Sequence, residues 1–339
     1  MTNKISNCIL LAIMVVAIVV MTSCREQDKK YFVNSGVVWT TEYHIKYESQ
    51  SDLNDSIQQL FTELDKSVSV YNKKSRITDI NNNDSVVADD YFIKLYNKAL
   101  EVNKASEGLY DPTVMPLVNA WGFGYKSGAL PTRAQLDSIL QFVGLSHVQL
   151  NGNKVVKDDQ RVQFDFSSIA KGLACDAIAK MLERNGAENY MVEIGGEVVA
   201  RGVNEIGSTW HVSIDMPMPD DEKGAVHKSA LVIKLDSMAV ATSGNYRKFK
   251  EVEGKKVSHI VNPVTGESEN SSLLSVSIVA GDCMSADAWA TACMAMGDIK
   301  TKAMMENNGS LGVMTISSDA QGNLVIWSNK RFSDLVERR

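Results

Sequence analysis

The chain has 339 residues, of which 44% are hydrophobic and 22% are charged. This composition is typical of a globular protein with a sizeable buried core and argues against intrinsic disorder. The formal net charge is −6, and no block of Lys or Arg occurs. These features argue against a nucleic-acid-binding surface, because phosphate backbones require concentrated positive charge. No linker or internal repeat divides the chain, so one compact catalytic domain is predicted over residues 37–330.

The N-terminal segment differs from the rest of the chain. An unbroken apolar run of 13 residues, Ile9–Met21, is followed by two small residues and then by Cys24. A membrane-spanning helix needs about 20 apolar residues, so this run is more typical of a signal peptide. Small residues directly before a Cys resemble the lipobox of bacterial lipoproteins, in which the Cys is acylated. We therefore expect a lipoprotein signal peptide over residues 1–24, lipidation at Cys24 and a polar tether over 25–36.

An ordinary cleaved signal or a short membrane anchor is the alternative interpretation of this segment. All three interpretations predict that the protein is exported and that its body lies outside the cytoplasm.

Hydrophobic periodicity and turn residues predict the secondary structure. Strands are expected at Val37–Tyr47, Arg161–Phe166, Tyr190–Ile194, Val198–Gly202, Trp210–Asp215, Ala230–Leu235, Leu273–Val279, Leu311–Ile316 and Leu324–Trp327. Helices are expected at Asp52–Lys66, Tyr91–Ser106, Ser168–Arg184, Ser285–Met296 and Ile299–Asn307, with another from a Thr132 cap to Gly144. Strands come in runs rather than in strict alternation with helices. The predicted class is therefore α+β with mostly antiparallel sheets and packed helices.

The segment Phe164–Asp176 combines the end of a predicted strand, two serines and the start of a helix. Free backbone N–H groups and the positive end of the helix dipole meet there, which is typical of an anion-binding site. Lys171 lies in the first helical turn, where a cation opposes the dipole, so a nearby anion is expected. A solvated surface lysine is the alternative.

Asp287 and Thr291 are four residues apart in a predicted helix and therefore share one face. A carboxylate and a hydroxyl in this arrangement can bind a hard cation such as Mg²⁺, which often takes few protein ligands and completes its shell with water and substrate phosphates. The alternative is that Asp287 only stabilises the first turn of its helix while Thr291 packs inward.

His259 precedes the sequence Ile-Val-Asn-Pro-Val-Thr-Gly, in a stretch rich in turn residues. A histidine can take a proton from a hydroxyl near neutral pH, and loops commonly hold catalytic groups. A structural role for His259 is the alternative. The glycines of Trp-Gly-Phe-Gly do not have the spacing of a dinucleotide-binding fold, and no phosphate-binding P-loop occurs.

Seven segments in order resemble the ApbE family of FAD:protein FMN transferases, once described as thiamine-biosynthesis lipoproteins. They are SVYNKKSRITDIN, GLYDPTVMPLVNAWGFG, DFSSIAKGLACD, EIGGEV, ATSGNYRKF, HIVNPVTG and ADAWATA. The similarity as a whole runs over roughly Val37–Ile316. The resemblance implies an α+β fold related to a duplicated T-fold. Trp39, Ser167, Asn262 and Ala290 depart from the residues commonest in the family.

The resemblance also implies roles for individual residues. Mg²⁺ would be bound by Asp287, Thr291 and the backbone carbonyl of Ala170. FAD would contact Trp39, Tyr71, Leu109, Tyr110, Asp111, Ser167, Lys171, Leu173, Asp176 and Val261. His259, Lys171 and Asp287 would act in catalysis, with His259 activating the acceptor hydroxyl.

The implied reaction is a Mg²⁺-dependent transfer of FMN from FAD to a Thr or Ser hydroxyl of a target protein, with release of AMP. Family targets are subunits of membrane electron-transport complexes, so the expected location is a lipid anchor on a bacterial membrane, facing the periplasm or the cell exterior. One alternative is an FAD pyrophosphatase that uses water as the acceptor. Another is a lipoprotein that binds FAD without turnover.

Overall fold

The computed structural model describes residues 29–124, 130–217, 228–245, 249–252, 255–268 and 271–337. The expected signal peptide over 1–24 and the lipidation site Cys24 lie outside these ranges. Within the described ranges, none of the helices combines the length and the apolar character that crossing a membrane requires.

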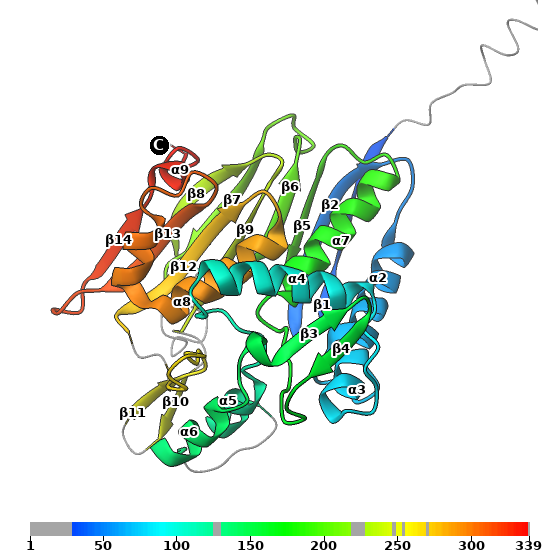
Figure 1. Cartoon of the computed structure of the whole chain (residues 1–339). Helices are drawn as coiled ribbons and strands as arrows, with labels where there is room; N and C mark the ends of the chain where they lie inside the picture. The colour runs from blue at the N-terminus through cyan, green and yellow to red at the C-terminus, as the bar shows by residue number, and fades with distance from the viewer. Residues whose placement is uncertain are drawn as a thin grey trace, which may run out of the picture.

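An eight-stranded sheet forms the centre of the molecule (Figure 1). All neighbouring strands of this sheet are antiparallel. In spatial order the strands are β1 (Lys30–Val38), β2 (Thr41–Ser49), β5 (Tyr190–Ile194), β6 (Glu197–Arg201), β9 (Met238–Gly244), β12 (Leu273–Ala280), β13 (Gly312–Ser318) and β14 (Leu324–Ser328). The predicted α+β class with mostly antiparallel sheet is therefore confirmed.

Helices cover one face of this sheet, and a separate hairpin covers part of the other (Figure 1). The helical layer consists of α2 (Asn54–Val68), α4 (Asp90–Ala105), α7 (Ala170–Arg184) and α8 (Cys283–Met305), and the hairpin of β7 (Trp210–Asp215) and β8 (Ser229–Leu235). Ala239 and Ala241 of β9 face the helices, whereas Val240 between them packs with the hairpin. This alternation is expected because successive strand residues point to opposite faces.

Smaller elements complete the described fold. They are α3 (Arg76–Asn82), α5 (Met115–Ala120), α6 (Arg133–Leu140), the 3-10 turn η1 (Leu145–His147), the hairpin of β3 (Val148–Asn151) and β4 (Lys154–Lys157), the hairpin of β10 (Phe249–Val252) and β11 (Lys255–Ser258), and α9 (Lys330–Ser333). In Figure 1, α5, α6 and the β10–β11 hairpin lie together beyond one end of the main sheet.

The N-terminal hairpin differs from its prediction. The single strand expected over Val37–Tyr47 is interrupted at Trp39 and Thr40, which form the turn between β1 and β2 with φ values of 48° and 65°. The tether expected over 25–36 is wrong for residues 30–36, which belong to β1. These residues pair along their whole length with β2, which supplies the backbone partners that a solvated tether would lack.

Most other predicted elements are confirmed within a few residues, and α6 shows the predicted capping box between Thr132 and Gln135. The strand expected over Arg161–Phe166 is wrong. Its alternating residues are buried as a strand pattern requires, but the backbone of Phe164 bonds to the side chain of Asn81 at 2.7 and 2.8 Å. Because this side chain satisfies the backbone of Phe164, the expected strand is reduced to an isolated parallel bridge between Gln163 and Val114.

The start of α8 also differs from its prediction. Asp282, not Ser285, is the N-cap, and its carboxylate accepts hydrogen bonds from both the amide and the hydroxyl of Ser285. The break expected at Gly297 is present as a kink, where φ is 75°. The helices expected on either side of Gly297 are therefore joined into one element.

Helices α7 and α8 pack closely at Gly172. A Cβ atom on Gly172 would lie 2.5 Å from the carbonyl oxygen of Cys283 and 2.7 Å from the Cα of Met284. Both are backbone atoms of α8, so neither can move aside without shifting the helix. Glycine at this position is therefore a condition for the observed approach of the two helices.

We predict that Gly172→Ala lowers the free energy of unfolding by about 2–3 kcal/mol, because overpacking forces the two helices apart. Gly309→Ala is the matched control, since a Cβ there meets no atom within 4 Å and Gly309 does not require a positive φ. The control should change stability by less than about 1 kcal/mol. Urea denaturation measures both, and equal stability of the two variants would contradict the packing argument.

Candidate functional site

The first turn of α7 presents free backbone donors. The helix begins at Ala170 rather than at the predicted Ser168, and the N-cap residue Ile169 provides no side-chain hydrogen bond. Ser167 instead donates its amide to Asp165 at 2.8 Å. Among the described residues, the backbone amides of Ser168 and Lys171 have no acceptor. Uncapped amides at a helix N-terminus are suited to an anion such as a phosphate.

Lys171 extends from this first turn to Glu197, the first residue of β6, and forms an ion pair with it. The Lys171 side chain is 32% exposed and that of Glu197 is 3% exposed. Burial lowers the pKa of Lys171, but the negative charges of Glu197 and Asp287 outweigh this effect and raise the pKa to about 12. Lys171 is therefore charged, and its ammonium stays beside the helix N-terminus.

Asp287 links α8 to the same turn of α7. Its Oδ2 accepts a hydrogen bond from the amide of Gly172 at 3.0 Å, two residues after Ala170. Burial and the charge of Glu197 raise the pKa of Asp287 well above its usual range, against the opposing effect of Lys171. The two segments that the sequence singled out, around Ala170 and Asp287, thus lie together.

The oxygen donors at this point fit a hard divalent cation. Among the described residues, Oδ1 of Asp287 accepts no hydrogen bond. Thr291, one helical turn further along α8, has its hydroxyl 3.4 Å from that of Ser243 on β9. A carboxylate oxygen and a hydroxyl are ligand types that Mg²⁺ uses, together with backbone carbonyls and water.

A metal site built from several acidic or imidazole side chains is not found. In the ranges that the structure describes, no group of three or more His, Cys, Asp or Glu could hold a metal ion. A cation at Asp287 would therefore need ligands from a hydroxyl, from backbone carbonyls and from a bound substrate.

The loop Leu109–Asp111, expected to contact FAD, lies next to α7. The hydroxyl of Tyr110 is 3.1 Å from that of Ser168, and the Tyr110 side chain is buried. Asp111 is also buried, and its carboxylate accepts hydrogen bonds from the amides of Thr113 and Leu145 at 2.8 Å each. The observed contacts of Asp111 therefore organise the loop itself.

Tyr71 and Trp39, two further expected flavin contacts, both lie in turns. Tyr71 is 74% exposed, and partial burial together with the charge of Asp165 raises its pKa. An exposed aromatic ring near the segment that leads into α7 is of the kind that stacks on planar ligands. Trp39, at the β1–β2 turn, packs edge-on against Phe61 with ring centroids 5.5 Å apart.

The remaining expected flavin contacts are less accessible. Leu173 is buried in the main core, and Val261 is buried with residues of α5 and α6 in a small apolar cluster. Asp176 accepts hydrogen bonds from the amides of Cys283 and Met284 at 2.8 and 2.9 Å. Asp176 therefore stabilises the start of α8, a role that the sequence did not predict.

His259 follows β11 directly and is partly exposed. Its ring meets that of Phe123 edge-on, with centroids 6.3 Å apart. The turn after it is held by Asn262, whose side chain accepts hydrogen bonds from the amides of Val264 and Thr265 at 2.9 and 3.1 Å. His259 thus precedes a turn that side-chain hydrogen bonds hold in place.

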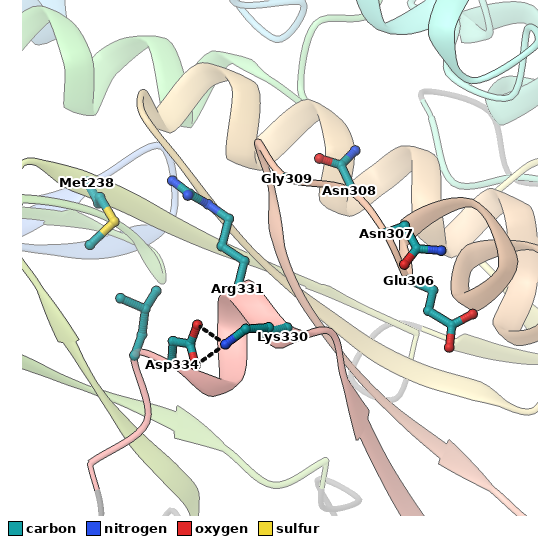
Figure 2. Close-up of a pocket in the computed structure, with 9 residues that line it drawn as sticks. Met238, Glu306, Asn307, Asn308, Gly309, Lys330, Arg331 and Asp334 are labelled. Atoms are coloured by element: carbon teal, nitrogen blue, oxygen red, sulfur yellow. Dashed lines mark hydrogen bonds and ion pairs between the residues drawn. The ribbon is translucent and has the colours of Figure 1, made fainter.

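A cavity of about 470 Å³ lies elsewhere, beside α9 (Figure 2). Its lining includes Met238, at the opposite end of β9 from Ser243, and Arg331. Lys330 in this lining is paired with Asp334 at 3.0 Å. The cavity shares no residue with the site at α7 and α8.

Sequence reasoning did not assign a role to Glu197, Ser243 or Gly172. The signal for Glu197 is a carboxylate that directly follows the Gly195–Gly196 turn and precedes three apolar strand residues. The signal for Ser243 is weaker, since a serine at the end of a strand is common. Gly172 lies inside a helix, where glycine is unfavourable and usually indicates a packing requirement.

The protein is of the α+β class, with a site formed where helices α7 and α8 meet beside an antiparallel sheet. The family model described as ApbE family matches residues 39–315. This chain belongs to the ApbE family.

Individual relatives agree along nearly the whole chain. The FAD:protein FMN transferase of Vibrio cholerae is 33% identical over 314 residues, covering 89% of this chain and 92% of the relative. The FAD:protein FMN transferase of Haemophilus influenzae is 32% identical, and the match covers 96% of this chain and 98% of the relative. The solved flavin transferase ApbE from Vibrio cholerae has a TM-score of 0.79 at 32% identity and covers 91% of this chain and 99% of that one. The Pseudomonas stutzeri flavinyl transferase ApbE, in its apo form, has a TM-score of 0.80 at 28% identity and covers 91% and 97%.

We predict that Asp176→Ala lowers the free energy of unfolding by about 2–3 kcal/mol in the absence of ligands, because two partly buried amides lose their acceptor. Asp176→Asn keeps one acceptor oxygen, so its free energy of unfolding should fall by about half as much. Urea denaturation measures the effect. If Asp176 were only a flavin contact, both variants would be as stable as the wild type.

Proposed function

We propose that this chain transfers the FMN half of FAD to a Thr or Ser hydroxyl of a target protein and releases AMP. Membership of a family whose curated relatives are named FAD:protein FMN transferase supports the proposal. The structural observation that carries it is the hydrogen bond between the Gly172 amide and Asp287, which joins an anion-binding helix terminus to a carboxylate suited to a cation.

The N-terminus of α7 would bind the pyrophosphate of FAD. Its free amides at Ser168 and Lys171 and the positive end of the helix dipole favour phosphate oxygens. Such preorganised donors stabilise charge that develops on phosphate oxygens during transfer. Asp287, Thr291 and the carbonyl of Ala170 would hold Mg²⁺, which would supply further positive charge at those oxygens.

In the transfer itself, the acceptor hydroxyl oxygen forms a bond to the phosphorus of the FMN half. The bond between this phosphorus and the bridging oxygen breaks, and AMP leaves with that oxygen. The proton of the hydroxyl passes to His259, which acts as the general base. The partial exposure of His259 supports this role, because a protein acceptor has to approach from outside.

We further propose that the protein is exported and lipid-anchored through Cys24, and faces the periplasm or the cell exterior. The apolar run Ile9–Met21 before Cys24 supports this location. An anchored enzyme would lie close to membrane electron-transport subunits, which are the proposed targets.

The direct test is to incubate the purified protein with FAD, Mg²⁺ and a candidate acceptor domain, and then to measure the mass of the acceptor. A gain equal to FMN, with release of AMP, is expected. Free FMN with an unmodified acceptor would indicate an FAD pyrophosphatase, and unchanged FAD would indicate a binding protein. Either of these results would contradict the proposal.

We predict that Asp287→Ala reduces the transfer rate by about 100-fold or more, because phosphate charge loses the cation that the carboxylate would hold. Asp287→Asn keeps an acceptor for the Gly172 amide but lacks the charge, so it should lose a similar factor. Single-turnover transfer at limiting Mg²⁺ measures both variants. Full activity of either one would contradict the assignment.

We predict that His259→Ala lowers kcat by about 100-fold, the usual contribution of a general base, while the Kd for FAD changes less than about twofold. Steady-state transfer and a fluorescence titration with FAD measure the two quantities. A loss of the same size in both would identify His259 as a binding residue instead.

A further inference from the structure

Glu197 is the most deeply buried carboxylate near the site without an assigned role in the reaction. It follows the Gly195–Gly196 turn, where φ is 62° and 99°, and its side chain is 3% exposed. Its carboxylate pairs with the ammonium of Lys171. The turn fixes the start of β6, so the backbone that carries Glu197 is set by the sheet rather than by a loop.

This ion pair is not explained by stability. Taking a carboxylate out of water is costly, and replacing a buried ion pair by apolar residues is often neutral or stabilising. The neighbouring residues of β6, Val198, Val199 and Ala200, are apolar and buried, so an apolar side chain at position 197 would suit this strand. A charge at this position therefore calls for a functional reason.

The charges around Lys171 suggest such a functional reason. Glu197 forms an ion pair with Lys171, and Asp287, which is bound to the amide of the next residue, Gly172, is the second carboxylate whose charge raises the pKa of Lys171. One ammonium is thus shared between two acidic groups. The cation that faces the expected pyrophosphate is already balanced before any ligand arrives.

We propose that Glu197 is a positioning residue that makes FAD binding depend on a divalent cation. It holds the Lys171 ammonium beside the N-terminus of α7 and cancels its charge, so the pyrophosphate binds tightly only when a divalent cation adds positive charge at Asp287. The proposal rests on the proposed function, since it assumes that the pyrophosphate of FAD lies at this turn.

The test is a titration of the full chain with FAD, followed by flavin fluorescence, in excess Mg²⁺ and again in excess EDTA. The quantity compared is the ratio of the Kd in EDTA to the Kd in Mg²⁺. For the wild type, Mg²⁺ should tighten binding by about tenfold or more, since a nearby divalent charge in a partly buried site is weakly screened.

Glu197→Gln keeps the size of the side chain and removes its charge. The uncancelled Lys171 should then tighten binding in EDTA by about five- to tenfold, and the ratio should fall accordingly. Glu197→Asp keeps the charge and should keep most of the wild-type ratio. Glu183→Gln is the matched control, because Glu183 pairs with Arg201 at the other end of α7, and it should leave the ratio unchanged.

A wild-type ratio near one, or a Glu197→Gln ratio equal to that of the wild type, would overturn the inference. If circular dichroism shows Glu197→Gln to be unfolded, Lys171→Gln provides the reciprocal comparison. It leaves the Glu197 charge uncancelled, so its ratio should exceed that of the wild type, and an unchanged ratio would overturn the inference. If the wild type does not bind FAD even with Mg²⁺, the proposed function fails instead.

Discussion

The hydrogen bond between the Gly172 amide and the Asp287 carboxylate is the contact on which the site depends. It joins the first turn of α7, which offers free amides and a positive dipole end, to the carboxylate of α8 that suits a cation. The contact requires that the two helices approach at Gly172, where a Cβ atom would meet the α8 backbone at 2.5 Å. A packing constraint between two helices thus determines where phosphate charge and metal charge can meet.

The rest of the fold fixes these two helices relative to the sheet. Asp176 of α7 accepts hydrogen bonds from the first amides of α8, so the two helices are linked at a second point. The turn before β6 brings Glu197 to Lys171, and β9 brings Ser243 to Thr291. The neighbouring strands β6 and β9 therefore bring to the site two side chains that lie far apart in the sequence. Such positioning by rigid strands is what a site that acts by orientation and electrostatics requires.

The sequence predicted the elements whose signals are local. Residues Tyr190–Ile194 and Trp210–Asp215 were predicted as strands with the bounds observed, and Thr132 with Gln135 as a capping box. Errors occurred where distant residues decide the local structure. The backbone of Phe164 bonds to the side chain of Asn81, and residues 30–36, which end in Asn34, Ser35 and Gly36, form a strand by pairing with β2. The proximity of Ala170 and Asp287 followed from the family resemblance, whereas the partner of Lys171 depends on tertiary structure that no local pattern encodes.

The most direct measurement is a crystal structure of the protein with FAD and Mn²⁺, which reports the metal position through its anomalous signal. The account predicts a single strong peak at coordination distance from Asp287, about 2.0–2.2 Å for a hard cation of this size, with the FAD pyrophosphate against the first turn of α7. A metal peak away from Asp287, or a flavin dinucleotide whose phosphates lie elsewhere, would contradict it.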